Sequence, residues 1–378
     1  MDISITEDEV NVVNVLNNEP MLCKVPFNQI LVTPNADVYL CCGSHIINMP
    51  PSAGNLLRKS GREIWNNEIY KKFRMSFADG SFRYCNTKTC SAAAKRHDPS
   101  SRFMIHTVSE IENDETLRDS NFQDYIDAPE SFDGSLRGMP TRLYLGMDNS
   151  CNLKCPSCRE KLIIEDHRNG RLDKLYENLR SITKAVEYLE IDGAGDVFAS
   201  SWYQRFLKNF PTEDFPNLKE IGFRSNGLLW TKKNWYRIHP YFRSKMINAL
   251  ISVDATTEET YKKVRGGCFH SLMENLDFIH YLLKNKEINC INLIMVYRKS
   301  NYKEIPQFIE LGKRLSASYI VINPLQAWEE SAYVINGQYD DEAIHLPTHP
   351  EHDAFKDCLN THGVKNGKDG EMYVDFSW

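Results

Sequence analysis

The chain lacks any apolar run approaching the roughly 18 residues that a membrane-spanning helix needs. Its first nine residues, Met-Asp-Ile-Ser-Ile-Thr-Glu-Asp-Glu, are acidic and have neither the basic start nor the apolar stretch of a signal peptide. Basic residues are scattered and the formal net charge is −6, which argues against binding to nucleic acid through a basic surface. We therefore expect a cytoplasmic protein without a nucleic-acid or membrane partner.

The composition is that of a soluble globular protein. The 378 residues are 42% hydrophobic and 25% charged, enough for one large domain and a smaller one. Eleven cysteines are present. Because disulfides are rare in the cytosol, this number favours metal or redox chemistry.

Three of these cysteines, Cys151, Cys155 and Cys158, lie in the run Asp-Asn-Ser-Cys-Asn-Leu-Lys-Cys-Pro-Ser-Cys-Arg. Iron–sulfur clusters are normally held by four cysteines, so a loop with three leaves one iron without a protein ligand. The alternatives are a zinc loop or three unrelated cysteines. Zinc sites usually pair two such motifs or add histidines, and neither lies close by in the sequence.

The spacing resembles the signature of the radical S-adenosylmethionine (radical SAM) superfamily. The resemblance implies an enzyme in which a [4Fe–4S] cluster on these cysteines binds SAM through its open iron. One electron from the cluster then cleaves SAM to a 5′-deoxyadenosyl radical. A non-catalytic iron–sulfur or zinc scaffold protein is the alternative from another functional class.

The middle of the chain alternates short apolar runs with amphipathic stretches, which is typical of parallel strand–helix units. The predicted strands are Thr141–Met147, Tyr188–Asp192, Glu220–Arg224, Ala249–Val253, Cys290–Val296 and Ser318–Asn323. Six strands suit the partial (βα)6 TIM-like barrel of radical SAM enzymes. Chemistry in such barrels lies at the carboxyl ends of the strands, where the cysteine loop and the next motifs also fall.

The segment after the second strand, Ile-Asp-Gly-Ala-Gly-Asp-Val-Phe, resembles the family element that holds the methionine ammonium of SAM. Gly193 and Gly195 allow close approach of the backbone, and Asp196 replaces the usual glutamate. An ordinary glycine turn is the alternative. After the third strand, Ser225 and Asn226 resemble a turn common in these barrels, which we interpret first as scaffold.

The segment after the fourth strand resembles that of SPASM- and twitch-bearing radical SAM enzymes. By resemblance, Ser252 and Arg265 contact the methionine carboxylate of SAM, and Asp254 lies near the ribose or the substrate. A guanidinium suits a carboxylate because it can make two parallel hydrogen bonds. Alternatively, or in addition, Asp254 and Thr256 cap the following helix.

Other residues near these strand ends leave alternatives open. Cys268 is a candidate catalytic hydrogen donor to a substrate radical, although a core or surface cysteine is the alternative. Cys358 is a hydrogen donor, a cluster ligand or neither. Many radical SAM loops carry an aromatic residue where this chain has Ser157, so adenine must be held by other groups, for which Val296 and Trp328 are candidates.

The first hundred residues resemble a SPASM/twitch cluster domain, with an expected β-hairpin around the turn Thr33–Asp37. Such a domain usually follows the barrel, whereas here it precedes it. The resemblance implies one auxiliary [4Fe–4S] cluster on Cys23, Cys41, Cys85 and Cys90. Cys42 competes as the second ligand, and zinc bound by the same thiolates is the alternative.

The predicted organisation is α/β, with a SPASM/twitch-like domain of β-hairpin and helix at 1–100 and a linker at 101–140. The partial barrel follows at 141–328 and a C-terminal extension at 329–378. The expected substrate is a peptide or protein side chain. A sugar, nucleotide sugar or other small metabolite is the alternative. An electron donor such as flavodoxin or ferredoxin is expected as a partner.

Overall fold

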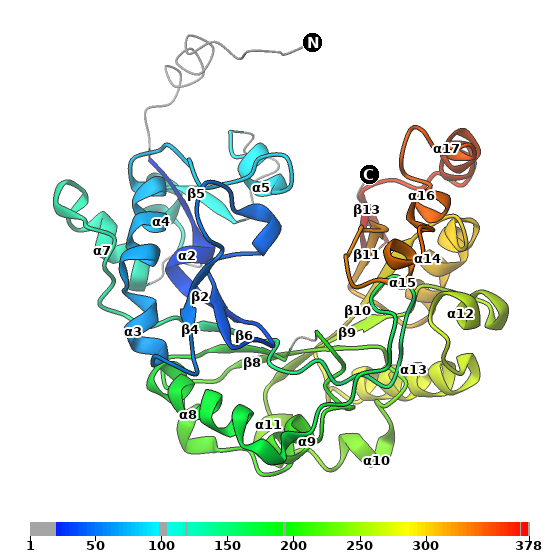
Figure 1. The fold of residues 1–378 in the computed structure, drawn as a ribbon, viewed down its shortest axis with the longest axis horizontal. Helices are drawn as coiled ribbons and strands as arrows, with labels where there is room; N and C mark the ends of the chain where they lie inside the picture. Colours follow the sequence, from blue (N-terminus) through cyan, green and yellow to red (C-terminus); the bar gives the residue numbers. More distant parts are fainter. Residues whose placement is uncertain are drawn as a thin grey trace, which may run out of the picture. The chain divides into compact units, whose positions relative to one another are not determined.

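The computed structural model of the protein describes residues 20–97, 104–115, 117, 120–191, 194–370 and 372–376. The chain forms two compact units. The first contains the described residues up to Val32, together with Ala36–Leu143 and Leu175–Val186. The second contains Thr33–Asn35, Tyr144–Lys174 and the described residues from Glu187 onward. Figure 1 shows the course of the chain through both.

The first unit is built from short elements. Its strands are β1 (Met21–Cys23), β2 (Gln29–Val32), β3 (Asp37–Tyr39), β4 (Ser52–Asn55) and β5 (Ile105–Thr107). Its helices are α2 (Lys24–Asn28), α3 (Gly61–Trp65), α4 (Glu68–Ala78), α5 (Ser91–Ala94), α6 (Val108–Asn113) and α7 (Ser120–Ile126). Strand β3 pairs antiparallel with both β2 and β4, which confirms the predicted hairpin.

Helix α4 shows why this unit holds together. Asn67 caps it by accepting hydrogen bonds from the amides of Ile69 and Tyr70. The buried side chains of the helix recur every three or four residues, which places them on one face. They include Tyr70, Phe73, Arg74 and Phe77.

The stretch 101–140, expected to be a linker, contains β5, α6 and α7 in its described part. Strand β5 pairs antiparallel with β1, and the ring of Phe122 lies 5.2 Å from that of Phe27. The first unit consequently continues to Leu143, beyond the expected boundary at residue 100. Strands of three residues are too short to show a clear alternation in the sequence.

The second unit is an α/β unit around a mostly parallel sheet. Its strand order is β12-β13-β11-β10-β9-β8-β7-β6. The strands are β6 (Arg142–Leu145), which begins at the boundary of the units, β7 (Tyr188–Ile191), β8 (Glu220–Ser225), β9 (Met246–Ser252), β10 (Cys290–Tyr297), β11 (Tyr319–Pro324), β12 (Gly367–Asp369) and β13 (Met372–Phe376). Strands β7 to β11 and β13 pair in parallel, whereas β12 is antiparallel to β13.

The six predicted strands correspond to β6 to β11, which confirms an α/β fold with a large, mostly parallel sheet. Strands β12 and β13 were not predicted, and they add to the sheet beside β11. The helices are α8 (Arg171–Thr183), which crosses the boundary between the units, α9 (Ser201–Lys208), α10 (Lys232–Trp235), α11 (Pro240–Arg243), α12 (Glu258–Val264), α13 (Phe269–Lys284), α14 (Ile305–Arg314), α15 (Ala332–Ile335), α16 (Tyr339–Glu342) and α17 (His352–Thr361).

The two faces of the sheet in the second unit differ in burial. In β9, Ile247, Ala249 and Ile251 are fully buried, whereas Asn248 and Leu250 between them are half-buried. Helices α9, α10, α11 and α13 gather on one side of β8 and β9 (Figure 1). Among the described residues, no helix combines the length and hydrophobicity that crossing a membrane requires.

Candidate active site

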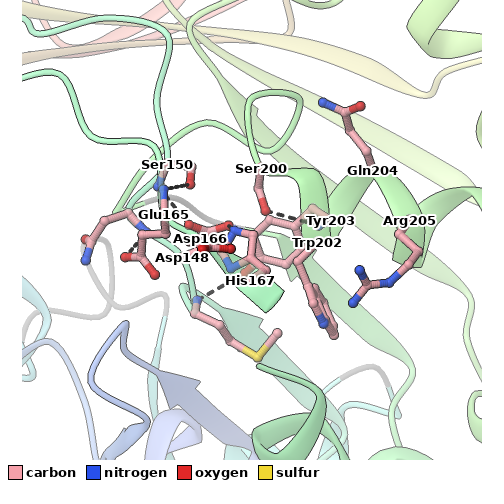
Figure 2. Close-up of polar contacts among 12 residues, drawn as sticks. Asp148, Ser150, Glu165, Asp166, His167, Ser200, Trp202, Tyr203, Gln204 and Arg205 are labelled. Atoms are coloured by element: carbon pink, nitrogen blue, oxygen red, sulfur yellow. Dashed lines mark hydrogen bonds and ion pairs between the residues drawn. The ribbon is translucent and has the colours of Figure 1, made fainter. Parts of the chain in front are cut away.

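The cysteine loop follows β6, at the carboxyl edge of the sheet. Tyr203 of α9 (Figure 2) fixes the end of that strand. Its hydroxyl donates to the carbonyl of Leu145 at 2.7 Å and accepts from the amide of Met147 at 3.0 Å. Further along, the amide of Cys158 donates to the carbonyl of Cys155, which forms a tight turn. Cys155 is buried, Cys151 is half-buried and Cys158 is exposed.

The segment 163–167 returns over the cysteine loop and is bonded to it at several points. The amide of Cys151 donates to the carbonyl of Ile163 at 2.9 Å, and the amide of Glu165 donates to Oγ of Ser150 at 2.9 Å. Nε2 of His167 lies 2.9 Å from Oδ2 of Asp148, and both side chains are buried (Figure 2). None of these contacts uses a cysteine sulfur. This contact between Asp148 and His167 was not predicted from the sequence.

Each of the three cysteine sulfurs accepts a hydrogen bond. Sγ of Cys151 accepts from the amide of Leu153 at 3.4 Å and from the side chain of Asn226 at 3.7 Å. Sγ of Cys155 accepts from Arg265, and Sγ of Cys158 from Arg159, both at 3.4 Å.

This donor set suits an iron–sulfur cluster, whose thiolate ligands are stabilised by hydrogen bonds and nearby cations. Burial raises the pKa of the Cys151 thiol to about 11. The amide of Leu153 and Arg159 oppose this shift, whereas the charges of Asp196 and Cys155 add to it. No three His, Cys, Asp or Glu side chains among the described residues are close enough to hold a single metal ion. A four-iron cluster spreads its ligands more widely than one ion does.

The loop after β7 lies directly against the cysteine loop. A Cβ at Gly195 would come within 2.1 Å of the carbonyl oxygen of Ser150, so only glycine fits. The amide of Asp196 donates to that same carbonyl at 2.8 Å. We expected Gly195 to allow a close backbone approach, and the group that it approaches is the protein's own backbone at Ser150. Gly193 lies outside the described residues.

The Asp196 carboxylate joins the loops after β7 and β8. It accepts from the hydroxyl of Ser225 and the amide of Asn226, both at 2.8 Å, and from the amide of Phe198 at 3.0 Å. The side chain is buried, and burial raises its pKa although these hydrogen bonds oppose the shift. Asp196 thus holds the turn that presents Asn226 to Cys151.

Asp254, after β9, joins three segments of the second unit. Its Oδ2 accepts from Arg298 at 2.9 Å and lies 3.2 Å from Nε of Arg265, and its Oδ1 accepts from the amide of Val296 at 2.8 Å. Burial opposes the charge of Arg265, but Asp254 and Cys155 raise its pKa above the ordinary value. Ser252, at the end of β9, is half-buried.

In this region, one prediction was wrong and one buried residue was not predicted. The cap of α12 is Thr257, which accepts from the amide of Thr260, so the expectation that Asp254 and Thr256 cap the helix was wrong. Arg298 is fully buried and was missed. Its position directly after β10 was the available signal, because functional groups gather at the carboxyl ends of such strands.

Cys268 is exposed at the position preceding α13. Its Sγ accepts a hydrogen bond from the hydroxyl of Ser271 at 3.4 Å. That bond, with amide contacts from the first turn, lowers the pKa of the thiol. This place fits the alternative of a surface cysteine.

In the first unit, the cysteines come from separate segments. Cys23 ends β1, and Cys41 and Cys42 follow β3. The backbone of Cys85 forms an isolated antiparallel β-bridge with Ile46, and Cys90 precedes α5. Burial raises the pKa of Cys23, and the negative charges of Cys85 and Cys90 add to the shift.

The other thiols show the same mutual influence. The pKa of Cys41 is raised by its hydrogen bond with Cys42, by burial and by the charge of Cys23. Burial and then Cys90 raise the pKa of Cys85 to about 12, while Arg96 opposes the shift. Electrostatic coupling thus links Cys23 with Cys85 and Cys90, and Cys41 with Cys23.

One comparison with known proteins agrees with the interpretation of the first hundred residues as a cluster-binding domain. Residues 23–91 match the SPASM family, described as an iron–sulfur cluster-binding domain, which confirms the predicted similarity of the first hundred residues. No curated protein sequence matches the chain.

Solved structures show only low similarity. SuiB of Streptococcus suis bound to the precursor peptide SuiA is 13% identical over 95% of this chain and 72% of that chain, with a TM-score of 0.42. TYW1 with a lysine–pyruvate adduct is 17% identical over 59% of this chain and 74% of that chain, with a TM-score of 0.37. The SPASM match is therefore the comparison that bears on function.

Proposed function

We propose that the chain is a radical SAM enzyme that holds a [4Fe–4S] cluster on Cys151, Cys155 and Cys158. The observation that carries the proposal is the single loop on which all three sulfurs accept hydrogen bonds, two of them from arginines. When bound, the cluster supplies the electron that splits SAM into methionine and a 5′-deoxyadenosyl radical, which abstracts hydrogen from the substrate.

The protein's own residues orient SAM and keep the loop in place. Arg265 lies beside Cys155, and we assign it, with Ser252, to the methionine carboxylate. Asp254 holds Arg265 in position through its Nε, 3.2 Å from the carboxylate. We assign the methionine ammonium to the backbone around Gly193 and Gly195, with Asp196 shaping that loop.

The first unit is proposed to hold one auxiliary [4Fe–4S] cluster on Cys23, Cys41, Cys85 and Cys90. The SPASM match and the electrostatic coupling of Cys23 with Cys41, Cys85 and Cys90 support this set. Cys42 is the competing second ligand, because its thiol is exposed and hydrogen-bonded to that of Cys41. The proposed substrate is a peptide or protein side chain, the commonest role of SPASM-bearing relatives, and the proposed reductant is a flavodoxin or ferredoxin.

The first test is anaerobic reconstitution followed by reaction with SAM and dithionite. Two cubane clusters predict about eight irons and eight sulfides per chain. Changing Cys151, Cys155 and Cys158 together to Ala should remove half of the iron and abolish formation of 5′-deoxyadenosine, measured by liquid chromatography. Full iron content in this variant, or no 5′-deoxyadenosine from the wild type, would contradict the proposal.

The second test separates the two clusters. Changing Cys23, Cys85 and Cys90 together to Ala should leave SAM cleavage detectable while product formation fails, because SAM binds at the other cluster. Metal analysis of the full chain decides between iron and zinc in the first unit. One zinc and about four irons per chain would replace the auxiliary cluster with a zinc site.

A further inference from the structure

Arg159, the residue after the last cysteine of the loop, is held in one orientation by three contacts. Its Nε donates to Sγ of Cys158 at 3.4 Å, its Nη1 donates to the carbonyl of Asn149 at 2.7 Å, and its Nη2 donates to the carbonyl of Ala194. The residue is only 7% exposed. All the groups that it contacts therefore lie in the loops after β6 and β7.

The Arg159 guanidinium is positively charged, because an arginine side chain stays protonated in proteins at ordinary pH. No carboxylate is among the partners that fix the side chain. Its positive charge is consequently directed at the sulfurs.

Cys158 is the exposed member of the three, whereas Cys155 is buried. Water can stabilise an exposed thiolate but holds no fixed orientation. A buried arginine that directs an N–H at this sulfur supplies a permanent donor on the side facing the protein. Hydrogen bonds to cluster sulfurs and nearby net charge are the features by which a protein sets a cluster's reduction potential.

We propose that Arg159 sets the reduction potential of the cluster through its charged hydrogen bond to Cys158, so that the cluster accepts an electron more readily. This inference rests on the proposed function. Reduction adds one negative charge to the cluster, and a fixed cation stabilises the reduced state more than the oxidised one. The carbonyls of Asn149 and Ala194 act by preventing the guanidinium from turning towards solvent.

The test is a redox titration of the reconstituted full chain without SAM, followed by electron paramagnetic resonance. The signal that changes when SAM is added identifies the cluster on Cys151, Cys155 and Cys158. Arg159→Gln should raise the ratio of oxidised to reduced cluster at a fixed potential about tenfold, which is about 59 mV for a one-electron couple. Arg159→Lys, which keeps the charge but loses the fixed N–H, should raise it about threefold.

Arg168→Gln is the matched control. Arg168 lies nine residues further along the same loop, is 91% exposed and pairs with Asp166. It should leave the potential unchanged. The inference would be overturned if the reduction potential of Arg159→Gln equalled that of the control. It would also be overturned if the potential of Arg159→Lys fell as far as that of Arg159→Gln.

Two further outcomes are separated by the same samples. If Arg159→Gln binds less iron than the wild type, the reduction potential of Arg159→Lys is compared with that of Arg168→Gln instead. Equal potentials in those two variants overturn the inference. A wild-type chain without a SAM-sensitive signal would instead contradict the proposed function, and with it this inference.

Discussion

Replacing Asp254 with Asn is the sharpest test of the charge arrangement at the carboxyl ends of β9 and β10. Asp254 is buried, and its two oxygens meet Arg298, Arg265 and the amide of Val296. Asparagine has the same shape but carries no charge, and its NH2 group must face one of these donors. Arg298 is fully buried and has no other acid within ion-pair distance among the described residues.

The magnitude follows from the contacts. Removing one partner of a buried ion pair costs about 3–5 kcal/mol, because the other charge stays buried. Arg265 keeps its bond to Cys155, so Arg298 accounts for most of the loss. We expect a local destabilisation of about 3 kcal/mol, which corresponds to roughly a hundredfold faster exchange in the affected segments.

Hydrogen exchange measured by mass spectrometry is the suitable assay. The chain contains two units, so one unfolding transition for the whole protein does not report on this site. Exchange should accelerate in peptides covering β9 and β10. Asp173→Asn is the control, because Asp173 is 59% exposed where it pairs with Arg205 and asparagine keeps an oxygen that can accept from Trp202. The lost charge should cost less than about 1 kcal/mol. Equal exchange in the two variants would refute the argument.

Three further predictions concern single residues. Arg265→Ala should weaken SAM binding by about 1.5–3 kcal/mol in calorimetry, the range for hydrogen bonds to charged groups; unchanged binding would make Arg265 structural. Arg74→Met should destabilise α4 by about 3 kcal/mol in hydrogen exchange, since it leaves the buried carbonyls of Pro26, Trp65 and Gly134 without their donor, whereas Arg74→Lys should cost less. Iodoacetamide should alkylate Cys268 with a pH midpoint below the ordinary thiol pKa, and Ser271→Ala should move that midpoint upward.

The sequence predicted the parts of the fold that repeat. Runs such as Cys290–Val296 are long and apolar, and they became strands of the parallel sheet. Strand β13 was missed although Met372, Val374 and Phe376 are buried in alternation, the pattern of a strand with one covered face. That signal was available in the sequence.

The chemistry of the candidate site was only partly accessible. Spacing indicated the three cysteines, and the resemblance to SPASM- and twitch-bearing enzymes indicated Asp254. Arg159 and Arg298 could not be assigned a partner, because their contacts with Ala194 and Asp254 join positions 35 and 44 residues apart. Whether Cys41 or Cys42 is the better ligand likewise depends on burial rather than on spacing.

The hydrogen bonds that hold segment 163–167 against the cysteine loop bear on how the protein matures. They end on the carbonyl of Ile163, the hydroxyl of Ser150 and the Asp148–His167 pair, so none of them uses a cysteine sulfur that iron would need. In small zinc domains, by contrast, metal binding supplies the free energy of folding. These contacts therefore do not compete with iron for a ligand, and we expect them to persist when oxygen damage strips iron from the loop.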